Sequence, residues 1–416
     1  MKILHIAPSD SKGGASLAAR RLHEGLRDTG IDSRMLVVHK ATDDPDIFSY
    51  ASKSLYRFER AFAGIERRVI AKSQPLGAER VSTNFVRSLT IRKYLRKHAD
   101  ALIHIHWPGD GLLDVGLFAE LALRGPFCWT FHDMWGMTGG CHYDQLCGKW
   151  KLGCRKCPQV SPLLYWAPRL SWLQKKRLWK SDRMNIICPS HWMKEEAEKS
   201  PILQYASLHY VPNPIDTEAF TAKDKRQCRE TLGIPTDRSI ILFGAANSVH
   251  DKRKGYAYLL DSLKRLRQSY TPRDLHLVVF GSKSSVTEIE GYPTTFLGEI
   301  RGADRLAEVY SAADVFVAPS LQDNLPNTIV EAISCGTPVV AFNVGGVSDI
   351  VVSGQTGYLA KPYNISELAD FIGVCLSSER ISSKARDYTL NMFSRETVIP
   401  KFKKLYSGIL KASNVI

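Results

Sequence analysis

Short apolar runs recur along the chain and alternate with amphipathic stretches. Residues 2–7 and 33–38 are such runs near the N-terminus, and residues 240–244, 277–280 and 315–317 repeat the pattern past the middle. Continuous apolar runs of this length are typical of buried parallel strands, and their alternation with helices indicates an α/β sheet. The pattern therefore predicts two doubly wound, Rossmann-like α/β domains.

The domain boundary is predicted near the middle of the chain. A length of 416 residues suits two domains of roughly 200 residues each. Pro212-Asn213-Pro214 interrupts the alternation, so we assign residues 1–212 to the first domain and 213–394 to the second. The amphipathic pattern of residues 395–410 predicts a C-terminal helix.

Residues 54–72 predict a basic amphipathic helix. Its apolar positions, at helical spacing, are Leu55, Phe58, Phe62, Ile65 and Val69, and its basic positions are Arg57, Arg60, Arg67, Arg68 and Lys72. Two interpretations stay open. The helix could dock on a membrane surface, or it could be an ordinary domain helix with a basic solvent face. Residues 170–180 predict a second basic helix.

The net charge of +14 is unevenly distributed. Residues 1–185 hold 30 Lys+Arg against 17 Asp+Glu, a balance of +13, whereas residues 186–416 hold 26 against 25, a balance of +1. This asymmetry favours a polyanion or an anionic membrane surface as partner of the first domain, with a general solubility charge as the alternative. No apolar run approaches the ~18 residues that span a bilayer, and the N-terminal strand is too short and polar for a signal peptide. We therefore expect a cytoplasmic protein.

The clearest candidate site follows the strand predicted at Val315–Val317. A loop comes next, and Thr328 with Glu331 has the spacing of a capping box, which predicts a helix starting at Thr328. A strand, a loop and a helix N-terminus together form an anion site, because unpaired backbone N–H groups and the helix dipole face the loop. The carboxylates of Asp323 and Glu331 flank this site. Without further information, Glu331 could equally be only a capping residue.

Two further candidates belong to the first domain. Gly13 and Gly14 separate the first strand from a helix predicted at residues 17–26, where they allow a phosphate to approach the backbone or simply form a tight turn. His132 follows the strand at residues 127–131, and ligands of open α/β sheets gather at such strand ends. His106 is a weaker second candidate, and a lone histidine is often structural.

Four of the nine cysteines lie within 17 residues: Cys141, Cys147, Cys154 and Cys157. Cytoplasmic chains rarely keep disulfides, so the cluster indicates a structural Zn²⁺ held by four thiolates in an inserted loop, residues 139–158. Unliganded cysteines in a long loop are the alternative. A catalytic zinc is not expected, because four protein ligands leave no open position.

The segment from Asp323 to Ala341, D-N-L-P-N-T-I-V-E-A-I-S-C-G-T-P-V-V-A, resembles the acidic-x7-acidic motif of retaining GT-B glycosyltransferases of the family-4 type. N-P-I-D-T-E-A-F, from Asn213 to Phe220, is similar to a second family feature. The chain departs from the family twice: Asp323 stands where Glu is usual, and Ala245-Ala246-Asn247 stands where an arginine is usual. The resemblance implies a GT-B fold of two facing domains, with the C-terminal helix, residues 395–416, returning to the first domain.

The resemblance also implies a donor site for a nucleoside-diphosphate sugar, without a catalytic metal. Lys254 would neutralise the donor diphosphate, with Arg253 as substitute for the missing arginine. Glu331 would accept the ribose hydroxyls, and Asp323 would bind hydroxyls of the sugar. The remaining donor-contacting positions implied are Gly13, Gly14, His132, Asn324, Leu325, Asn327 and Thr328.

The function implied is that of a retaining glycosyltransferase. It would move a hexosyl group from the donor to a glycan or a polyprenyl-diphosphate-linked acceptor in surface polysaccharide biosynthesis (exopolysaccharide, capsule or lipopolysaccharide). The acceptor would bind the basic first domain, at the anionic inner face of the cell membrane, with the protein attached peripherally and without a nucleic-acid partner. Two alternatives stay open: a non-catalytic GT-B homologue acting as a binding protein, and a GT-B sugar-nucleotide epimerase.

Overall fold

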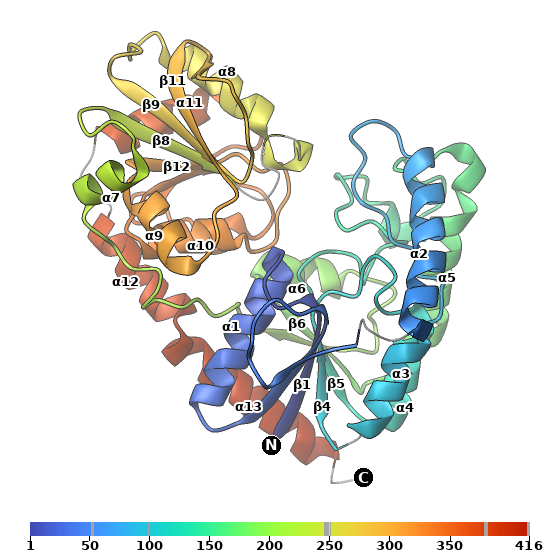
Figure 1. The fold of residues 1–416 in the computed structure, drawn as a ribbon. Coiled ribbons are helices and arrows are strands. Elements are labelled where there is room, and N and C mark those ends of the chain that lie inside the picture. The colour runs from blue at the N-terminus through green and yellow to red at the C-terminus, as the bar shows by residue number, and fades with distance from the viewer. Residues whose placement is uncertain (51–53, 99, 245–248, 250, 378–381, 414–416) are drawn as a thin grey trace. The chain divides into compact units, whose positions relative to one another are not determined.

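The computed structural model describes residues 1–50, 54–98, 100–244, 249, 251–377 and 382–413. The chain divides into two compact units (Figure 1). The first unit consists of Met1–Asn213 together with Val398–Ile416, and the second of Pro214–Thr397. The chain thus leaves the first unit near the predicted boundary and returns to it at its C-terminal end.

The first unit is built on a seven-stranded sheet of described residues in the order β3-β2-β1-β4-β5-β6-β7, and all its strand pairs are parallel. The strands are β1 (Lys2–Ser9), β2 (Asp32–His39), β3 (Ile47–Ser49), β4 (Leu102–Ile105), β5 (Phe127–Thr130), β6 (Met184–Cys188) and β7 (Ser207–Tyr210). The helices are α1 (Gly14–Asp28), α2 (Ser54–Ser73), α3 (Leu89–Lys97), α4 (Val115–Arg124), α5 (Trp166–Leu178) and α6 (His191–Glu198). The predicted strands of this domain are therefore present, and β3 and β7 extend the sheet at its two edges.

Successive side chains of β1 point to opposite faces of the first sheet, and each face has its own apolar core. Leu4 belongs to the cluster that includes Ile91 of α3 and Phe118 of α4. Ile3 belongs to the cluster on the other face, which includes Leu22 of α1. Helices on both faces explain why the strands are apolar throughout rather than alternating.

The second unit repeats this architecture in the strand order β10-β11-β9-β8-β12-β13-β14, with only β10 antiparallel among the described pairs. Its strands are β8 (Ser239–Gly244), β9 (Leu275–Phe280), β10 (Glu288–Ile289), β11 (Tyr292–Gly298), β12 (Val315–Ala318), β13 (Val339–Phe342) and β14 (Gly357–Ala360). Its helices are α7 (Lys225–Leu232), α8 (Tyr256–Leu266), α9 (Ala303–Ser311), α10 (Asn327–Ser334), α11 (Ile365–Leu376) and α12 (Ser382–Phe393). The prediction of two doubly wound α/β domains is confirmed.

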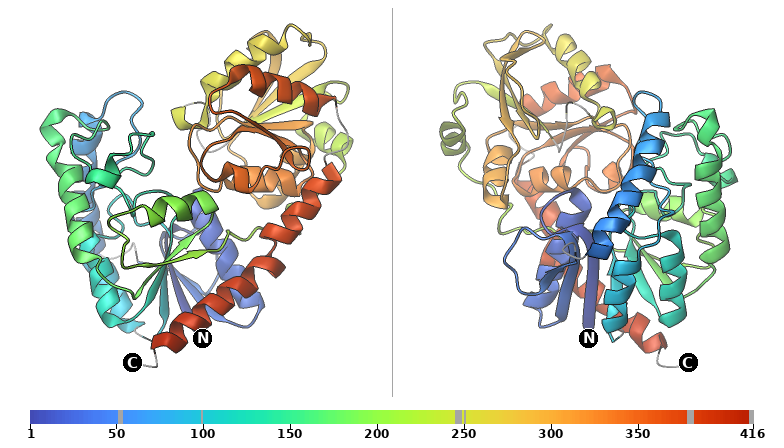
Figure 2. Two further views of the ribbon diagram at one scale, coloured as in Figure 1. Left: turned by 180° about the vertical axis from the view of Figure 1, so that it is seen from behind. Right: turned by 45° about the vertical axis from the view of Figure 1, so that its right-hand side comes forward.

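Helices of the second unit also cover both sheet faces. Alternate side chains of β8 belong to two apolar clusters, one on each face of the sheet. One cluster includes residues of α9 and α10, and the other includes residues of α8 and α11 (Figures 1 and 2). The two chain segments that lead out of this unit lie next to each other. The Ile215 N–H donates to the Phe393 carbonyl at 2.8 Å, and Arg395 pairs with Asp216 at 3.2 Å.

The predicted C-terminal helix is α13 (Arg395–Ser413), and it packs against the sheet of the first unit. Val398, Phe402 and Tyr406 recur every four residues and are buried in one cluster with Ile3 of β1 and Leu102 of β4. The Tyr406 hydroxyl shares a hydrogen bond of 2.7 Å with His104 Nδ1 in the sheet. The last helix of the chain therefore completes the core of its first domain.

The helix predicted at residues 54–72 is present as α2, but its orientation differs from that of an ordinary domain helix. Its buried side chains are Tyr56, Ala63 and Ile70. The apolar positions noted in the sequence, Leu55 to Val69, are exposed instead. No helix in the described part of the chain is long and apolar enough to cross a membrane.

Phe402→Ala tests the packing of α13. Removing this fully buried ring should lower the free energy of unfolding of the first unit by about 3–5 kcal/mol, because a cavity remains. All eight tryptophans belong to the first unit, so tryptophan fluorescence during urea unfolding reports on that unit alone. Lys404→Ala, on the exposed side of the same helix, should change stability by no more than about 0.5 kcal/mol. Equal effects of the two variants would contradict this role of α13.

Candidate functional site

The candidate site of the second unit lies at the carboxyl ends of β8 and β12. These strands are neighbours in the middle of the sheet, where the strand order changes direction. Open α/β sheets bind ligands at this point, because the loops on either side of it diverge. One loop after β8 leads to Lys254, and the loop after β12 carries Asp323.

Asp323 is the centre of an ion-pair cluster. Lys254 Nζ donates to Asp323 Oδ2 at 2.7 Å, and Arg253 donates to the same oxygen at 3.0 Å. The backbone N–H of Asn324 donates to the other oxygen, Oδ1, at 3.0 Å. Burial favours the neutral acid, but Lys254 and Arg253 outweigh it and hold the pKa of the Asp323 carboxyl well below its usual range. Asp323 is therefore an anion, although only 7% of it is exposed.

Two glycines allow the loops around Asp323 to pack closely. A Cβ on Gly255, where φ is +73°, would lie 1.8 Å from the Pro319 carbonyl oxygen. A Cβ on Gly345, where φ is +56°, would lie 1.8 Å from the Asp323 carbonyl oxygen, which accepts the Gly346 N–H at 3.0 Å. Only glycine fits either position, so three loops are fixed around one carboxylate.

The capping box predicted at Thr328 and Glu331 is wrong. Helix α10 begins at Asn327 and its N-cap is Pro326, which has no side-chain acceptor and whose ring fixes an extended conformation before the helix. Thr328 is thus already the second helical residue, and Glu331 lies in the second turn. Glu331 is 3% exposed and accepts the Tyr310 hydroxyl of α9 at 3.0 Å.

The other donor-site candidates of the second unit line the approach to α10. Asn324 and Leu325 are buried, and Leu325 joins the apolar core beneath the loop. Asn327 and Thr328 are partly exposed in the first turn of α10. The positions where the family has its arginine, Ala245 to Asn247, lie outside the described residues. Arg253 instead brings a guanidinium next to Lys254, on the same carboxylate.

His132 belongs to the first unit, where it follows β5 and ends a row of histidines. His132 Nε2 shares a hydrogen bond of 3.1 Å with His106 Nδ1, and His106 Nε2 shares one of 3.0 Å with His5 Nδ1. Burial lowers the pKa of His132 to about 4, so its imidazole is neutral at pH 7. His5, His104 and His106 place one nitrogen each within 4.8 Å of one another, but both nitrogens of His104 already bond to Thr130 and Tyr406.

The sequence reasoning missed this histidine row, although a signal was present. His104 lies in β4 and His106 directly follows that strand two residues later, and His5 is the register partner of His104 in the adjacent strand. Asp133 also went unnoticed. Its carboxylate accepts Trp107 Nε1 at 2.7 Å and His142 Nδ1 at 2.6 Å, which fixes the loop that carries His132.

Gly13 and Gly14 form the start of α1 after β1, at the carboxyl end of the first sheet. Gly13 has a φ of +85° and is the N-cap of α1, which begins at Gly14. The helix therefore starts three residues earlier than residue 17, where the sequence pattern placed it. Gly13 is exposed, so the start of α1 lies at the surface of the first unit.

The four clustered cysteines share one region of the first unit. Cys141 and Cys157 belong to one small apolar cluster. The pKa of the Cys141 thiol is raised mainly by burial and secondly by the nearby sulfurs of Cys154 and Cys157. Among the described residues, no three of these sulfurs lie within 4.8 Å of one another. The thiols are therefore neighbours, but they are not arranged as metal ligands in this structure.

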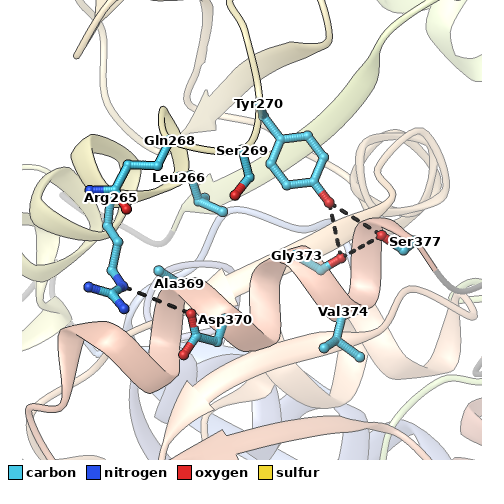
Figure 3. Close-up of a pocket in the computed structure, with 10 residues that line it drawn as sticks. All are labelled: Arg265, Leu266, Gln268, Ser269, Tyr270, Ala369, Asp370, Gly373, Val374 and Ser377. Atoms are coloured by element: carbon cyan, nitrogen blue, oxygen red, sulfur yellow. Dashed lines mark hydrogen bonds and ion pairs between the residues drawn. The ribbon is translucent and has the colours of Figure 1, made fainter.

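A hollow of about 710 Å³ lies elsewhere on the second unit, between the end of α8 and α11 (Figure 3). The Tyr270 hydroxyl donates to the Gly373 carbonyl at 3.3 Å on one side, and Arg265 faces Asp370 at 3.9 Å on the other. Helix α8 starts next to Lys254 and runs away from it for 11 residues, about 16 Å. The hollow is therefore at the opposite end of the sheet from Asp323 and includes none of the predicted site residues.

Two doubly wound units and a last helix that returns to the first of them define a GT-B fold. The protein-family model described as "Glycosyltransferase Family 4" matches residues 12–219, half of the chain. A second family model, described as "Glycosyl transferases group 1", matches residues 238–378. The chain belongs to glycosyltransferase family 4.

Named relatives agree with this assignment. A D-inositol 3-phosphate glycosyltransferase of Xylanimonas cellulosilytica is 32% identical over 46% of this chain, and a lipopolysaccharide 1,2-N-acetylglucosaminetransferase of Salmonella typhimurium is 27% identical over 53%. These matches span 50% and 61% of the two relatives. The crystal structure of Anabaena Alr3699/HepE in complex with UDP and glucose has a TM-score of 0.65, covering 98% of this chain and 100% of that one at 18% identity, which shows a shared fold.

The cysteine cluster gives a testable prediction. Lys175 is buried near Cys141 and Cys154, and its ammonium donates to the carbonyls of Trp135 and Thr138 at 2.6 and 3.1 Å. Four thiolates on Zn²⁺ would carry a net charge of −2, which the Lys175 cation would offset in part. We expect about one zinc per chain in protein purified without chelator, bound after local rearrangement of the loop.

Metal analysis of variants checks this expectation. Cys154→Ser with Cys157→Ser should abolish zinc binding, whereas Cys228→Ser, at a buried cysteine of the second unit, should leave it intact. A metal-free protein whose melting temperature does not respond to zinc or to chelator would overturn the zinc site.

Proposed function

We propose that this protein transfers a hexosyl group from a nucleoside-diphosphate sugar to an acceptor hydroxyl with retention of anomeric configuration. The observation that carries the proposal is the cluster of Lys254 and Arg253 on Asp323, at the ligand-binding end of the second sheet. Two cations at this position supply the positive charge that attracts a diphosphate, and with the anion of Asp323 the cluster carries a net charge of +1. Membership of family 4 and the UDP-bound HepE of the same fold support a nucleotide-sugar donor.

The cluster suggests how the donor is activated. When the diphosphate binds, Lys254 and Arg253 exchange part of their pairing with Asp323 for phosphate oxygens, and the N-terminus of α10 adds its dipole. The bond from the anomeric carbon to the phosphate oxygen then breaks, and charge accumulates on the leaving diphosphate. Preorganised cations stabilise this charge in the transition state. The acceptor oxygen bonds to the same face of the sugar, and its proton passes to the departing phosphate, so no protein base and no catalytic metal is required.

The remaining residues orient the donor. Glu331 accepts the ribose hydroxyls, and its bond to Tyr310 fixes the direction of the carboxylate. Asp323 accepts hydroxyls of the sugar once its cations turn to the phosphates. In the first unit, the His132 imidazole, neutral at pH 7, is a hydrogen-bonding group for the substrate, and Gly13 and Gly14 let an anionic group approach the start of α1.

The acceptor is proposed to bind the basic first unit, which holds the whole charge excess. A glycan on a polyprenyl diphosphate at the inner face of the cell membrane fits this positive field. The Salmonella relative is named for lipopolysaccharide synthesis, which supports a role in surface polysaccharide formation.

Lys254→Met tests the donor site. The variant should lower kcat/KM for donor hydrolysis or transfer by about 100-fold, because one preorganised cation is lost. Lys252→Met is the matched control, since Lys252 is an exposed cation in the same short 3-10 helix, Lys252–Lys254. A panel of radiolabelled nucleotide sugars identifies the substrate. Donor isomerised without transfer would favour an epimerase, and tight donor binding without turnover would favour a binding protein.

Glu331→Gln tests the ribose contact. The amide oxygen can still accept the Tyr310 hydroxyl, so the fold should persist while the donor KM rises by about tenfold or more. Tyr310→Phe removes the donor of this hydrogen bond and leaves the Glu331 carboxylate in place. It therefore measures the contribution of the hydrogen bond to stability alone. A lowered melting temperature with unchanged KM for Glu331→Gln would show that Glu331 is only structural.

A further inference from the structure

Helix α2 presents an apolar stripe to solvent. Leu55, Phe58, Phe62, Ile65 and Val69 are each between 42% and 62% exposed. At about 100° per residue these five positions fall within an arc of about 80°. The Phe58 and Phe62 rings lie 4.7 Å apart between centroids, so the stripe is continuous. Scattered exposed apolar residues are ordinary, but an aligned stripe of this length indicates a surface that is covered by a partner.

The charged residues of α2 are sorted around this stripe. Arg57, Arg68 and Lys72 are exposed on one flank by helical position. The acidic residues are held toward the unit instead. Glu59 accepts the Thr90 N–H at 2.8 Å, and Glu66 bonds to the Thr83 hydroxyl and accepts the Phe85 N–H. The solvent side of α2 is therefore apolar and cationic, while the carboxylates of Glu59 and Glu66 accept hydrogen bonds within the unit.

Neighbouring segments extend the apolar surface at the end of α2. Leu76, three residues beyond the helix, is 96% exposed. The Ser161 N–H donates to the Ser73 carbonyl at 2.8 Å, which joins this end to the segment entering α5, where Leu163 and Trp166 are also exposed. In Figures 1 and 2, α2 and α5 lie on the same side of the first unit. Tryptophan next to basic side chains is typical of groups at a lipid–water interface.

We propose that the face formed by Leu55, Phe58, Phe62, Ile65, Val69, Arg57, Arg68 and Lys72, the α2 docking face, inserts into the surface of an anionic lipid bilayer. Helix α2 lies in the plane of the interface, with its stripe among the acyl chains and its cations at the lipid phosphates. The charge balance of +13 over residues 1–185 selects an anionic bilayer over a neutral one and over an apolar protein groove. The purpose of this docking rests on the proposed function, because a lipid-linked acceptor is presented at the membrane.

Vesicle sedimentation with the full chain tests the proposal. Binding to phosphatidylcholine vesicles that contain phosphatidylglycerol should exceed binding to pure phosphatidylcholine by at least about tenfold, and it should fall steeply as salt rises, because exposed charges are screened over about 8 Å at physiological ionic strength. Phe58→Ser with Phe62→Ser should weaken binding by about tenfold or more. Phe48→Ser, at an exposed phenylalanine of β3 in the same unit, should have no effect.

A charge-reversed pair separates specific docking from net charge. The double variant Arg68→Glu with Lys72→Glu should abolish vesicle binding. The control double variant, Lys401→Glu with Lys404→Glu, changes the net charge by the same amount at exposed positions of α13, on the other face of the sheet. This control should retain most of the vesicle binding. Equal loss in both pairs, or full binding by the phenylalanine variant, would overturn insertion of α2. A concentration-dependent dimer that the phenylalanine variant loses, without vesicle binding, would assign the face to a second copy of this chain.

Donor hydrolysis in solution distinguishes this inference from the proposed function. The α2 variants should hydrolyse the donor at the wild-type rate, because Asp323 and its cations belong to the second unit. Hydrolysis without vesicle binding would overturn the docking face alone. Stripe-dependent vesicle binding without turnover of any donor would overturn the proposed function alone.

Discussion

The buried carboxylate of Asp323 is the group on which the arrangement of the loops at the carboxyl end of the second sheet depends. A buried anion is costly unless it is paired, and here Lys254 and Arg253 provide the pairing. The backbone of Asp323 also joins two loops, because its carbonyl accepts the Gly346 N–H. A second backbone hydrogen bond, from the Leu321 N–H to the Arg253 carbonyl, ties the loop of Asp323 to the segment that carries its cations. In the absence of donor, the two cations are thus held in place by an internal anion. Under the proposed function, a donor diphosphate would meet a site whose charges are already assembled, which would reduce the reorganisation that binding requires.

Much of this site could be predicted from the sequence, since strand, loop and helix follow one another between Val315 and Ser334 as the apolar pattern indicates. The helix start could not. Thr328 and Glu331 have capping-box spacing, but Pro326 fixes the chain one residue before Asn327 and takes the N-cap position. The partner of Glu331 comes from α9, and a contact between separate helices leaves no local signature in the sequence.

The first unit shows a different limit of sequence reasoning. Periodicity predicted α2, but the helix has two apolar sides, and the unit buries the one with Tyr56, Ala63 and Ile70. Which side faces inward depends on the space left by α3 and the loops, and the sequence does not give that shape. Prediction from cysteine spacing has the same limit. The spacing indicates that Cys141 and Cys157 lie near each other, but it does not determine whether the four sulfurs converge on one point.

The place of α13 has a consequence for biosynthesis. Its apolar side covers Ile3, Leu102 and Ile187 in the first sheet, yet the ribosome makes Pro214–Thr397 before it makes Val398. At 5–20 residues per second this sheet face waits on the order of 10 to 40 s for its cover. The second unit is one continuous segment and can finish folding earlier. The order of maturation then runs against the order of synthesis, and a message cut short before Val398 yields a chain with an open apolar sheet, the kind of surface by which chaperones and proteases recognise unfinished proteins.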